Sequence, residues 1–271
     1  MVRRPALLVH ITRICICTLI WISVAASAQA DMTPHQAIYK MTLSSKSPAS
    51  RFNGVSGAAV SQVERTCEGW VVNEQVVMTM LTVAGGEIQR EMRFTAFESL
   101  DGNTYQFESN SLTNGKPEKF SGTAKRKADG TAEAEFVTPR PFEMPLPDAT
   151  QFYISMSRWL LDLAESGKRA AETYTFDGTD DEGPQKVSAF ILPDTSKPVD
   201  IAGDPELLDQ KAWKIRMAFF KIDTQAAQPE FEMSIRLLAN GIITSFELIF
   251  EDLVVDQVLQ DVMSAKDERC S

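Results

Sequence analysis

Alternation of apolar and polar residues runs through almost the whole chain, and it limits the available folds more than any other feature. In the stretch 35–43, apolar side chains occupy every second position, at Ala37, Tyr39, Met41 and Leu43. Because successive side chains of a strand point to opposite faces, this period predicts a half-buried β-strand. Comparable stretches lie at 57–65, 70–81, 87–97, 103–112, 119–127, 131–137, 173–176, 186–192, 213–222, 231–238, 242–250 and 253–262. The last of these also fits the period of a short helix.

Tight-turn dipeptides separate many of these stretches. They are Gly85-Gly86, Asp101-Gly102, Asn114-Gly115, Asp129-Gly130 and Asn240-Gly241. Such pairs favour hairpins, so the strands should pair antiparallel with their neighbours in the chain. Two segments interrupt the pattern. Residues 138–147 carry four prolines and should cross the molecule in an extended form, and residues 193–210 should form a long loop.

A single amphipathic helix is predicted after the proline-rich segment, opening at Asp148 and ending before Gly167. Its apolar stripe has the spacing i, i+4, i+7, i+8 and i+11, and consists of Phe152, Met156, Trp159, Leu160 and Leu163. A large antiparallel sheet twists and curls, and its concave face can cover such a stripe. We therefore predict a mainly β fold, a single open curled antiparallel sheet of about twelve to fourteen strands wrapped around one helix. The stripe could be plain core or could line a pocket for an apolar ligand.

The first residues have the pattern of a secretory signal. Arg3 and Arg4 precede an uncharged apolar run at 14–26, which ends in the small-x-small sequence of residues 26–28. The run is about thirteen residues, too short to span a bilayer, and no later segment is longer without charges. We expect a signal peptide at 1–28 with cleavage near Ala28 or Ala30, a single domain at 29–271, a periplasmic location and no transmembrane segment after cleavage.

Removal of this leader leaves Cys67 and Cys270 as the cysteines of the exported chain, 203 positions apart. In an oxidising compartment a disulfide between them is the simplest expectation. Closing so long a loop stabilises a fold by about 5 kcal/mol in the chain-entropy model, before any strain is subtracted. The alternatives are two free thiols, pairing between molecules, or a redox pair, which normally has the Cys-x-x-Cys spacing that is absent here.

Composition excludes several classes of function. The formal net charge of −10 becomes −13 once Arg3, Arg4 and Arg13 are removed with the leader, which argues against nucleic acid as a partner. His35 is then the one remaining histidine, so a catalytic triad or zinc-protease site would have to include it. The acidic turn of Asp177, Asp180, Asp181 and Glu182 lacks the spacing of a calcium loop and should be a solvated loop. We predict no catalytic, cofactor-binding or metal-binding residues, and no enzyme.

Several short motifs resemble those of one known family. They are the Pro-His-Gln-Ala-Ile-Tyr-Lys-Met-Thr-Leu run at 34–43, Cys-Glu-Gly-Trp at 67–70, Phe-Glu-Ser at 97–99 with Asp101-Gly102, Tyr-Gln-Phe at 105–107, Asp-Asp-Glu-Gly-Pro at 180–184, Asn240-Gly241 and the terminal Cys270. In this order and spacing they resemble the EipB-like cell-envelope integrity proteins, an exported family of Gram-negative bacteria. The likeness covers residues 34–270, which is nearly the whole chain after the leader.

The resemblance implies a periplasmic β-spiral whose two ends are tied by one disulfide. It also implies a role in maintaining the cell envelope, with a periplasmic tetratricopeptide-repeat protein as a candidate partner. The implied fold is similar to that of lipid and lipoprotein carriers, which is an analogy at the level of the fold. Two functions therefore remain open, a non-enzymatic protein that binds another protein and a carrier that holds a lipid between helix and sheet. A large apolar cavity would favour the carrier.

Overall fold

The computed structural model describes residues 32–195, 201–222 and 228–270. The signal peptide predicted at 1–28, with its cleavage near Ala28 or Ala30, lies outside the described residues.

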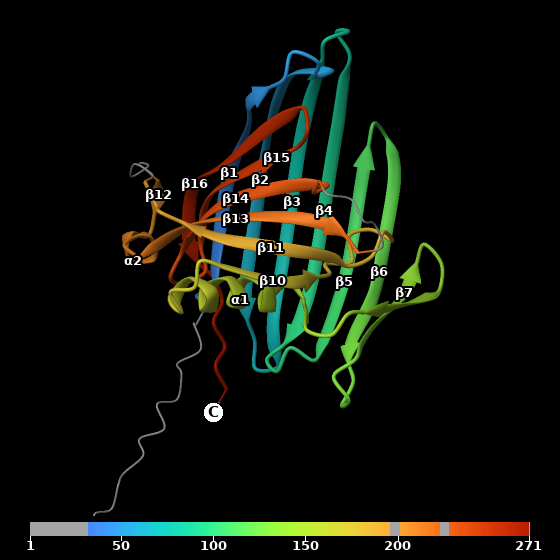
Figure 1. Ribbon diagram of the computed structural model, residues 1–271, viewed down its shortest axis with the longest axis vertical. Helices are drawn as coiled ribbons and strands as arrows, with labels where there is room; N and C mark the ends of the chain where they lie inside the picture. The colour runs from blue at the N-terminus through green and yellow to red at the C-terminus, as the bar shows by residue number, and fades with distance from the viewer. Residues whose placement is uncertain (1–31, 196–200, 223–227, 271) are drawn as a thin grey trace, which may run out of the picture.

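The described residues form one sheet of sixteen strands and two helices (Figure 1). The first half of the chain contributes β1 (His35–Lys46), β2 (Phe52–Arg65), β3 (Gly69–Thr82), β4 (Glu87–Ser99), β5 (Thr104–Thr113), β6 (Lys116–Arg126), β7 (Ala132–Thr138), β8 (Phe142–Leu146) and β9 (Thr150–Gln151). After helix α1 (Tyr153–Glu165) come β10 (Ala170–Thr175), β11 (Gln185–Leu192), β12 (Ala202–Gly203), helix α2 (Pro205–Leu208), β13 (Ala212–Lys221), β14 (Phe231–Leu238), β15 (Ile243–Ile249) and β16 (Leu253–Ser264).

The strand order explains how so long a sheet stays compact. It runs β8-β7-β6-β5-β4-β3-β2-β1-β16-β15-β14-β13-β11-β10-β9, with β12 attached to β16. The first and last strands therefore pair with each other in the middle of the sheet, where β1 and β16 run antiparallel. At the outer ends, β8 and β9 are separated by only three residues, 147–149, so the two edges of the curled sheet are brought together by a short turn.

The predicted fold class is confirmed, although the sheet has sixteen strands where about twelve to fourteen were predicted. The additional strands arise where the alternation is too short or is interrupted. The proline-rich segment contains β8, which lies at an edge where Pro145 removes no essential ladder bond. The predicted loop at 193–210 contains the two-residue strand β12 and the single-turn helix α2. The stretch at 253–262, which also fitted a helix, belongs to strand β16.

The predicted helix begins five residues later than expected. Asp148 does not open it; Phe152 is the N-cap and Tyr153 is the first helical residue. The residues before the cap are held in the sheet, because Thr150 and Gln151 pair with β10 as the parallel strand β9. Figure 1 shows α1 lying across one end of the curled sheet, next to β10.

Two groups of buried side chains form the core. The larger surrounds α1 and includes Trp70, Tyr105, Phe152, Ile154 and Leu161, each less than 2% exposed. The smaller lies where β1, β2 and β16 meet α2, and includes Tyr39, Phe52, Leu207, Leu259 and Val262. The alternation of the strands places the strand residues of both groups on the concave face of the sheet, where the buried side chains of α1 and α2 meet them.

Candidate functional site

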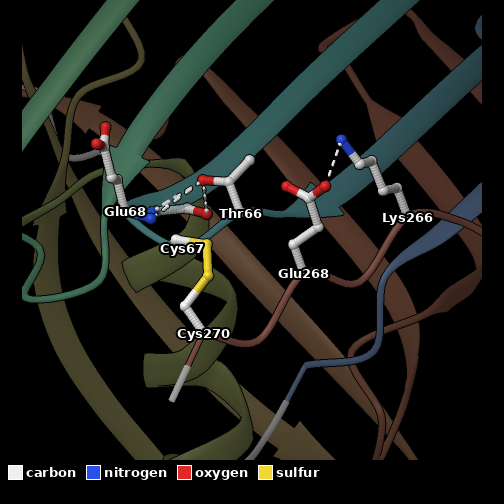
Figure 2. Close-up of a disulfide and its surroundings, with 7 residues drawn as sticks. Thr66, Cys67, Glu68, Lys266, Glu268 and Cys270 are labelled. Atoms are coloured by element: carbon white, nitrogen blue, oxygen red, sulfur yellow. Dashed lines mark hydrogen bonds and ion pairs between the residues drawn. A yellow bond between two sulfur atoms is a disulfide. The ribbon is translucent and has the colours of Figure 1, made fainter.

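The two cysteines join the C-terminal segment to the turn between β2 and β3. Cys67 and Cys270 form a disulfide with a Cα–Cα distance of 5.1 Å (Figure 2). Backbone hydrogen bonds support the same contact, since the Arg65 N–H donates to the Lys266 carbonyl at 3.1 Å and the Glu268 N–H donates to the Arg65 carbonyl at 2.9 Å. The bridge therefore reinforces a hydrogen-bonded seam that already attaches the end of the chain to β2.

A buried carboxylate from the sheet caps helix α1 at the same end of the molecule. Glu98, at the end of β4, is 2% exposed and accepts hydrogen bonds from the backbone N–H groups of Ile154 at 2.8 Å and Ser155 at 3.0 Å. The Phe152 N–H donates to the Ser155 hydroxyl at 2.7 Å, which satisfies another amide of the first turn. Burial raises the pKa of Glu98, and the two helix amides and the charge of Arg158 oppose that rise.

A second carboxylate, Glu74 on β3, holds the first residue of the helix. The Tyr153 hydroxyl donates to Glu74 at 2.5 Å, and the Ser61 hydroxyl donates to the same oxygen at 3.3 Å. Burial raises the pKa of Glu74, and these two hydrogen bonds oppose the rise. The two carboxylates thus fix the start of α1 against β3 and β4.

Sequence reasoning missed both carboxylates, although a signal for them exists. Register pairs Glu98 with Trp70 and Glu74 with Phe94, so each acid occupies an inward position of its strand. An acidic residue in the apolar phase of an alternating strand indicates a buried carboxylate that needs nearby donors. The donors could not be identified from the sequence. Those of Glu98 are backbone amides of a helix that lies more than fifty residues further along the chain, and those of Glu74 are the hydroxyls of Tyr153 on that helix and of Ser61 on β2.

The five residues of the predicted helix stripe do not share one environment. Phe152, Leu160 and Leu163 are buried, at 0%, 4% and 5% exposed, whereas Met156 and Trp159 are half-buried and pack at the margin of the core. Phe152 acts as the N-cap and stacks on Tyr105 with ring centroids 4.8 Å apart. The most deeply buried residues of the helix are Ile154 and Leu161, both 0% exposed, which the predicted stripe omitted.

His35 is 4% exposed, and its Nδ1 lies 2.8 Å from the carbonyl oxygen of Thr33. Burial lowers the pKa of His35, so the ring is neutral near pH 7. Among the described residues, no group of three or more His, Cys, Asp or Glu side chains is placed to hold a metal ion.

Two of the shallow hollows on the described surface are relevant here. One, of about 200 Å³, lies between α1 and the β4–β5 turn and is lined by Glu98, Leu100, Asp101, Gly102, Gln151, Ser155, Arg158, Trp159 and Asp162. The other, of about 160 Å³, lies over β13–β16 and is lined by Lys214, Ser234, Ile235, Arg236, Ser245, Phe246, Glu247, Asp256 and Val258. The first adjoins the carboxylate-capped end of α1, and it is the hollow that the helix itself helps to build.

Comparison with known proteins identifies the family. The model of the EipB-like family matches residues 26–266. The chain belongs to the EipB-like family. A relative from Brucella abortus (strain 2308), the cell envelope integrity protein EipB, is 23% identical over 236 residues, which are 84% of this chain and 82% of the relative. The resemblance stated from the sequence motifs is therefore confirmed.

A solved structure supports the architecture as well. It is the crystal structure of a beta-barrel-like protein of the domain of unknown function DUF1849 from Brucella abortus. It superposes with a TM-score of 0.80 at 22% identity and covers 87% of this chain and 99% of its own. At this identity the likeness establishes the shared EipB-like fold. Within the described part of the chain, no helix is long and apolar enough to cross a membrane.

Proposed function

We propose that this EipB-like protein supports cell-envelope integrity in the periplasm as a non-enzymatic protein that binds another protein. Family membership and the name of the Brucella relative support the envelope role. The leader predicted at 1–28 supports export. The partner class that we propose, following the family resemblance, is a periplasmic tetratricopeptide-repeat protein.

The packing of α1 is the observation that favours protein binding over carriage of a lipid between helix and sheet. Ile154 and Leu161 are fully buried, Leu160 is 4% exposed, and Phe152 stacks on Tyr105. These side chains occupy the space that an acyl chain would need at that interface. A packed interior of this kind is typical of a scaffold, whereas a carrier requires a large apolar cavity.

One observation favours a second candidate function, that of a lipid carrier. In this case the ligand would lie away from α1 and not between the helix and the sheet. Away from α1, the core-facing side chains of β3 and β4 are only half-buried; they include Val76, Met78, Met80, Ile88 and Met92. Methionine-rich surfaces adapt to varied apolar ligands. This candidate is tested by purifying the protein from the cells that naturally produce it, extracting any bound lipid and identifying that lipid by mass spectrometry. One equivalent of a defined lipid would favour the carrier, and its absence would favour protein binding.

Complementation of a deletion strain tests the binding role itself. The deletion should sensitise cells to detergent or to antibiotics that act on the cell wall, and wild-type protein should restore resistance. His35→Ala should restore it equally, because a binding scaffold needs no imidazole. If His35→Ala behaved like the deletion while remaining folded and abundant, the non-enzymatic role would be rejected.

A double variant of Cys67→Ser and Cys270→Ser provides the contrasting arm of that experiment. It should restore resistance poorly, because loss of the bridge loosens the fold and lowers the amount of protein. Immunoblotting of both variants separates loss of function from loss of protein.

A further inference from the structure

The hollow beside α1 has two walls that are fixed to each other. One wall is the helix face that carries Ser155, Arg158, Trp159 and Asp162, and the other is the β4–β5 turn with Leu100, Asp101 and Gly102. Glu98 lies between the walls and bonds the two helix amides described above. The Leu100 N–H donates to the Glu68 carbonyl at 3.1 Å, which ties the turn to the residue after Cys67. The hollow is therefore part of the rigid, disulfide-linked end of the molecule.

Two of the charged groups that line the hollow, Glu98 and Arg158, have opposite charges and already interact with the protein. Glu98 uses both carboxylate oxygens for the helix amides. The guanidinium of Arg158 lies 5.4 Å from the ring centroid of Trp70, and its charge acts on Glu98. Because the charge of Arg158 acts on Glu98, these two opposite charges offset each other, and the other two charged residues decide the net sign of the hollow.

The two remaining charges are both negative and both exposed. Asp101 accepts hydrogen bonds from the Ser99 hydroxyl at 2.6 Å and from the backbone and side-chain amides of Asn103 at 3.0 and 2.9 Å. A carboxylate has about four acceptor sites, so Asp101 retains capacity for another donor. Asp162 projects from the exposed side of α1, and no hydrogen bond or ion pair of its carboxylate is found within the described ranges.

Apolar groups accompany these carboxylates. The half-buried Trp159 lines the hollow from the helix, and Leu100, 41% exposed, lines it from the turn. Tryptophan is the side chain whose ring attracts a cation most strongly, and an aliphatic neighbour suits the methylene stem of a long basic side chain. Carboxylates beside an indole and a leucine are therefore complementary to an arginine or lysine side chain.

We propose that this hollow receives an arginine or lysine side chain of the partner protein, with Asp101 and Asp162 pairing its charge and Trp159 contacting its cationic head. The inference rests on the proposed protein-binding function and adds the chemistry of the contact. A volume of about 200 Å³ suits one side chain and not a folded element. The acidic chain, with a net charge of −13 after loss of the leader, would also speed the approach of a basic partner.

Titration with a minimal probe tests the site directly. The probe is the peptide acetyl-Gly-Arg-Gly-amide, followed by NMR of the ¹⁵N-labelled indole groups, with Trp159→Phe used to assign the Trp159 signal. The arginine peptide should shift that signal in a saturable way, and the matched peptide with neutral citrulline should shift it far less. Added salt should weaken the effect, because the carboxylates are exposed.

A matched pair of helix variants locates the charge. Asp162→Asn should weaken binding of the arginine peptide about two- to fivefold, as expected for a partly exposed ion pair. Glu165→Gln removes an exposed charge of the same helix that does not line the hollow, and it should leave binding unchanged. Circular dichroism of both variants should match wild type, since neither side chain is buried.

Three results would overturn the proposal. The first is a shift of the Trp159 signal that is as large with the citrulline peptide as with the arginine peptide. The second is a shift caused by the neutral sugar N-acetylglucosamine but not by the arginine peptide. The third is binding of the arginine peptide to Asp162→Asn with the affinity of the wild type. Photo-crosslinking in cells from a probe placed at Leu100 separates this inference from the proposed function. If a partner is captured elsewhere on the protein while Asp162→Asn cells remain resistant, the function stands and this site is rejected. If the deletion strain has no envelope defect although the peptide binds, the proposed function fails instead.

Discussion

At the scale of single residues, the two inward-facing glutamates, Glu74 and Glu98, determine how α1 is held against the sheet. A buried carboxylate is unfavourable unless donors surround it, and Glu98 meets this requirement with two backbone amides that would otherwise be unpaired. The same interaction places a negative charge at the positive end of the helix. Glu98 is therefore the residue through which the sheet sets the position of α1.

Substitution of Glu98 tests this role. Glu98→Leu replaces the carboxylate with an apolar side chain of similar size and leaves the Ile154 and Ser155 amides without acceptors. It should therefore lower the free energy of unfolding by about 2–4 kcal/mol. Urea denaturation measures the change. Glu91→Leu is the matched control, because Glu91 is an exposed residue on the opposite face of the same strand, and it should alter stability by less than about 0.5 kcal/mol. An unchanged midpoint for Glu98→Leu would contradict the capping role.

His35 should give stability a pH dependence of known sign. Burial lowers its pKa in the folded protein below the unfolded value of 6.5, so the unfolded chain binds the proton more readily. The contribution of neutral His35 is complete above pH 6.5 and is lost as the pH falls through the folded pKa. Wild type should therefore lose more stability than His35→Gln between pH 7 and pH 5, as measured by urea midpoints. Parallel curves for the two proteins would refute this assignment.

At the scale of secondary-structure elements, α1 shows how far sequence periodicity reaches. Leu160 and Leu163 of the predicted stripe lie on the buried face of the helix, but Asp148 was wrong as the helix start because Thr150 and Gln151 extend the sheet. Pairing of two residues with a strand beyond the helix leaves no local signature. Most strands were predictable, because each carries its own alternation, whereas β9 and β12 have only two residues and depend on their neighbours. The hollow was not predictable, since its walls come from separate elements.

The burial differences within α1 lead to a ranking of helix variants. Leu161→Ala removes a fully buried side chain and should cost about 2–5 kcal/mol of unfolding free energy. Trp159→Ala should cost less, because Trp159 is half-buried beside the hollow, even though tryptophan is the larger residue. Thermal and urea unfolding of both variants measures the order. A greater loss from Trp159→Ala would mean that the indole packs more deeply than the structure places it.

At the scale of the whole molecule, the topology makes the chain ends structurally central. The first and last long strands pair with each other, so closure of the curled sheet depends on contacts that are more than two hundred residues apart in the chain. Such closure is slow to form and entropically unfavourable. The Cys67–Cys270 bridge joins the same two regions, at the turn after β2 and the segment after β16. The bridge therefore constrains the unfolded chain at the place where the native fold must close.

Removal of the bridge should consequently destabilise the molecule unevenly. The Cys67→Ser, Cys270→Ser double variant should lose about 2–5 kcal/mol, seen as a lower melting temperature under non-reducing conditions. Amide hydrogen exchange should become fastest in residues 65–69 and 265–270, and next fastest in the β4–β5 turn, which the Leu100 N–H attaches to Glu68. The amides of α1 that bond Glu98 should stay protected until the whole protein unfolds. A wild-type protein treated with reductant should show the same pattern. Uniform loss of protection would mean that the bridge acts on the unfolded state alone, and unchanged stability would mean that the hydrogen-bonded seam closes the sheet without it.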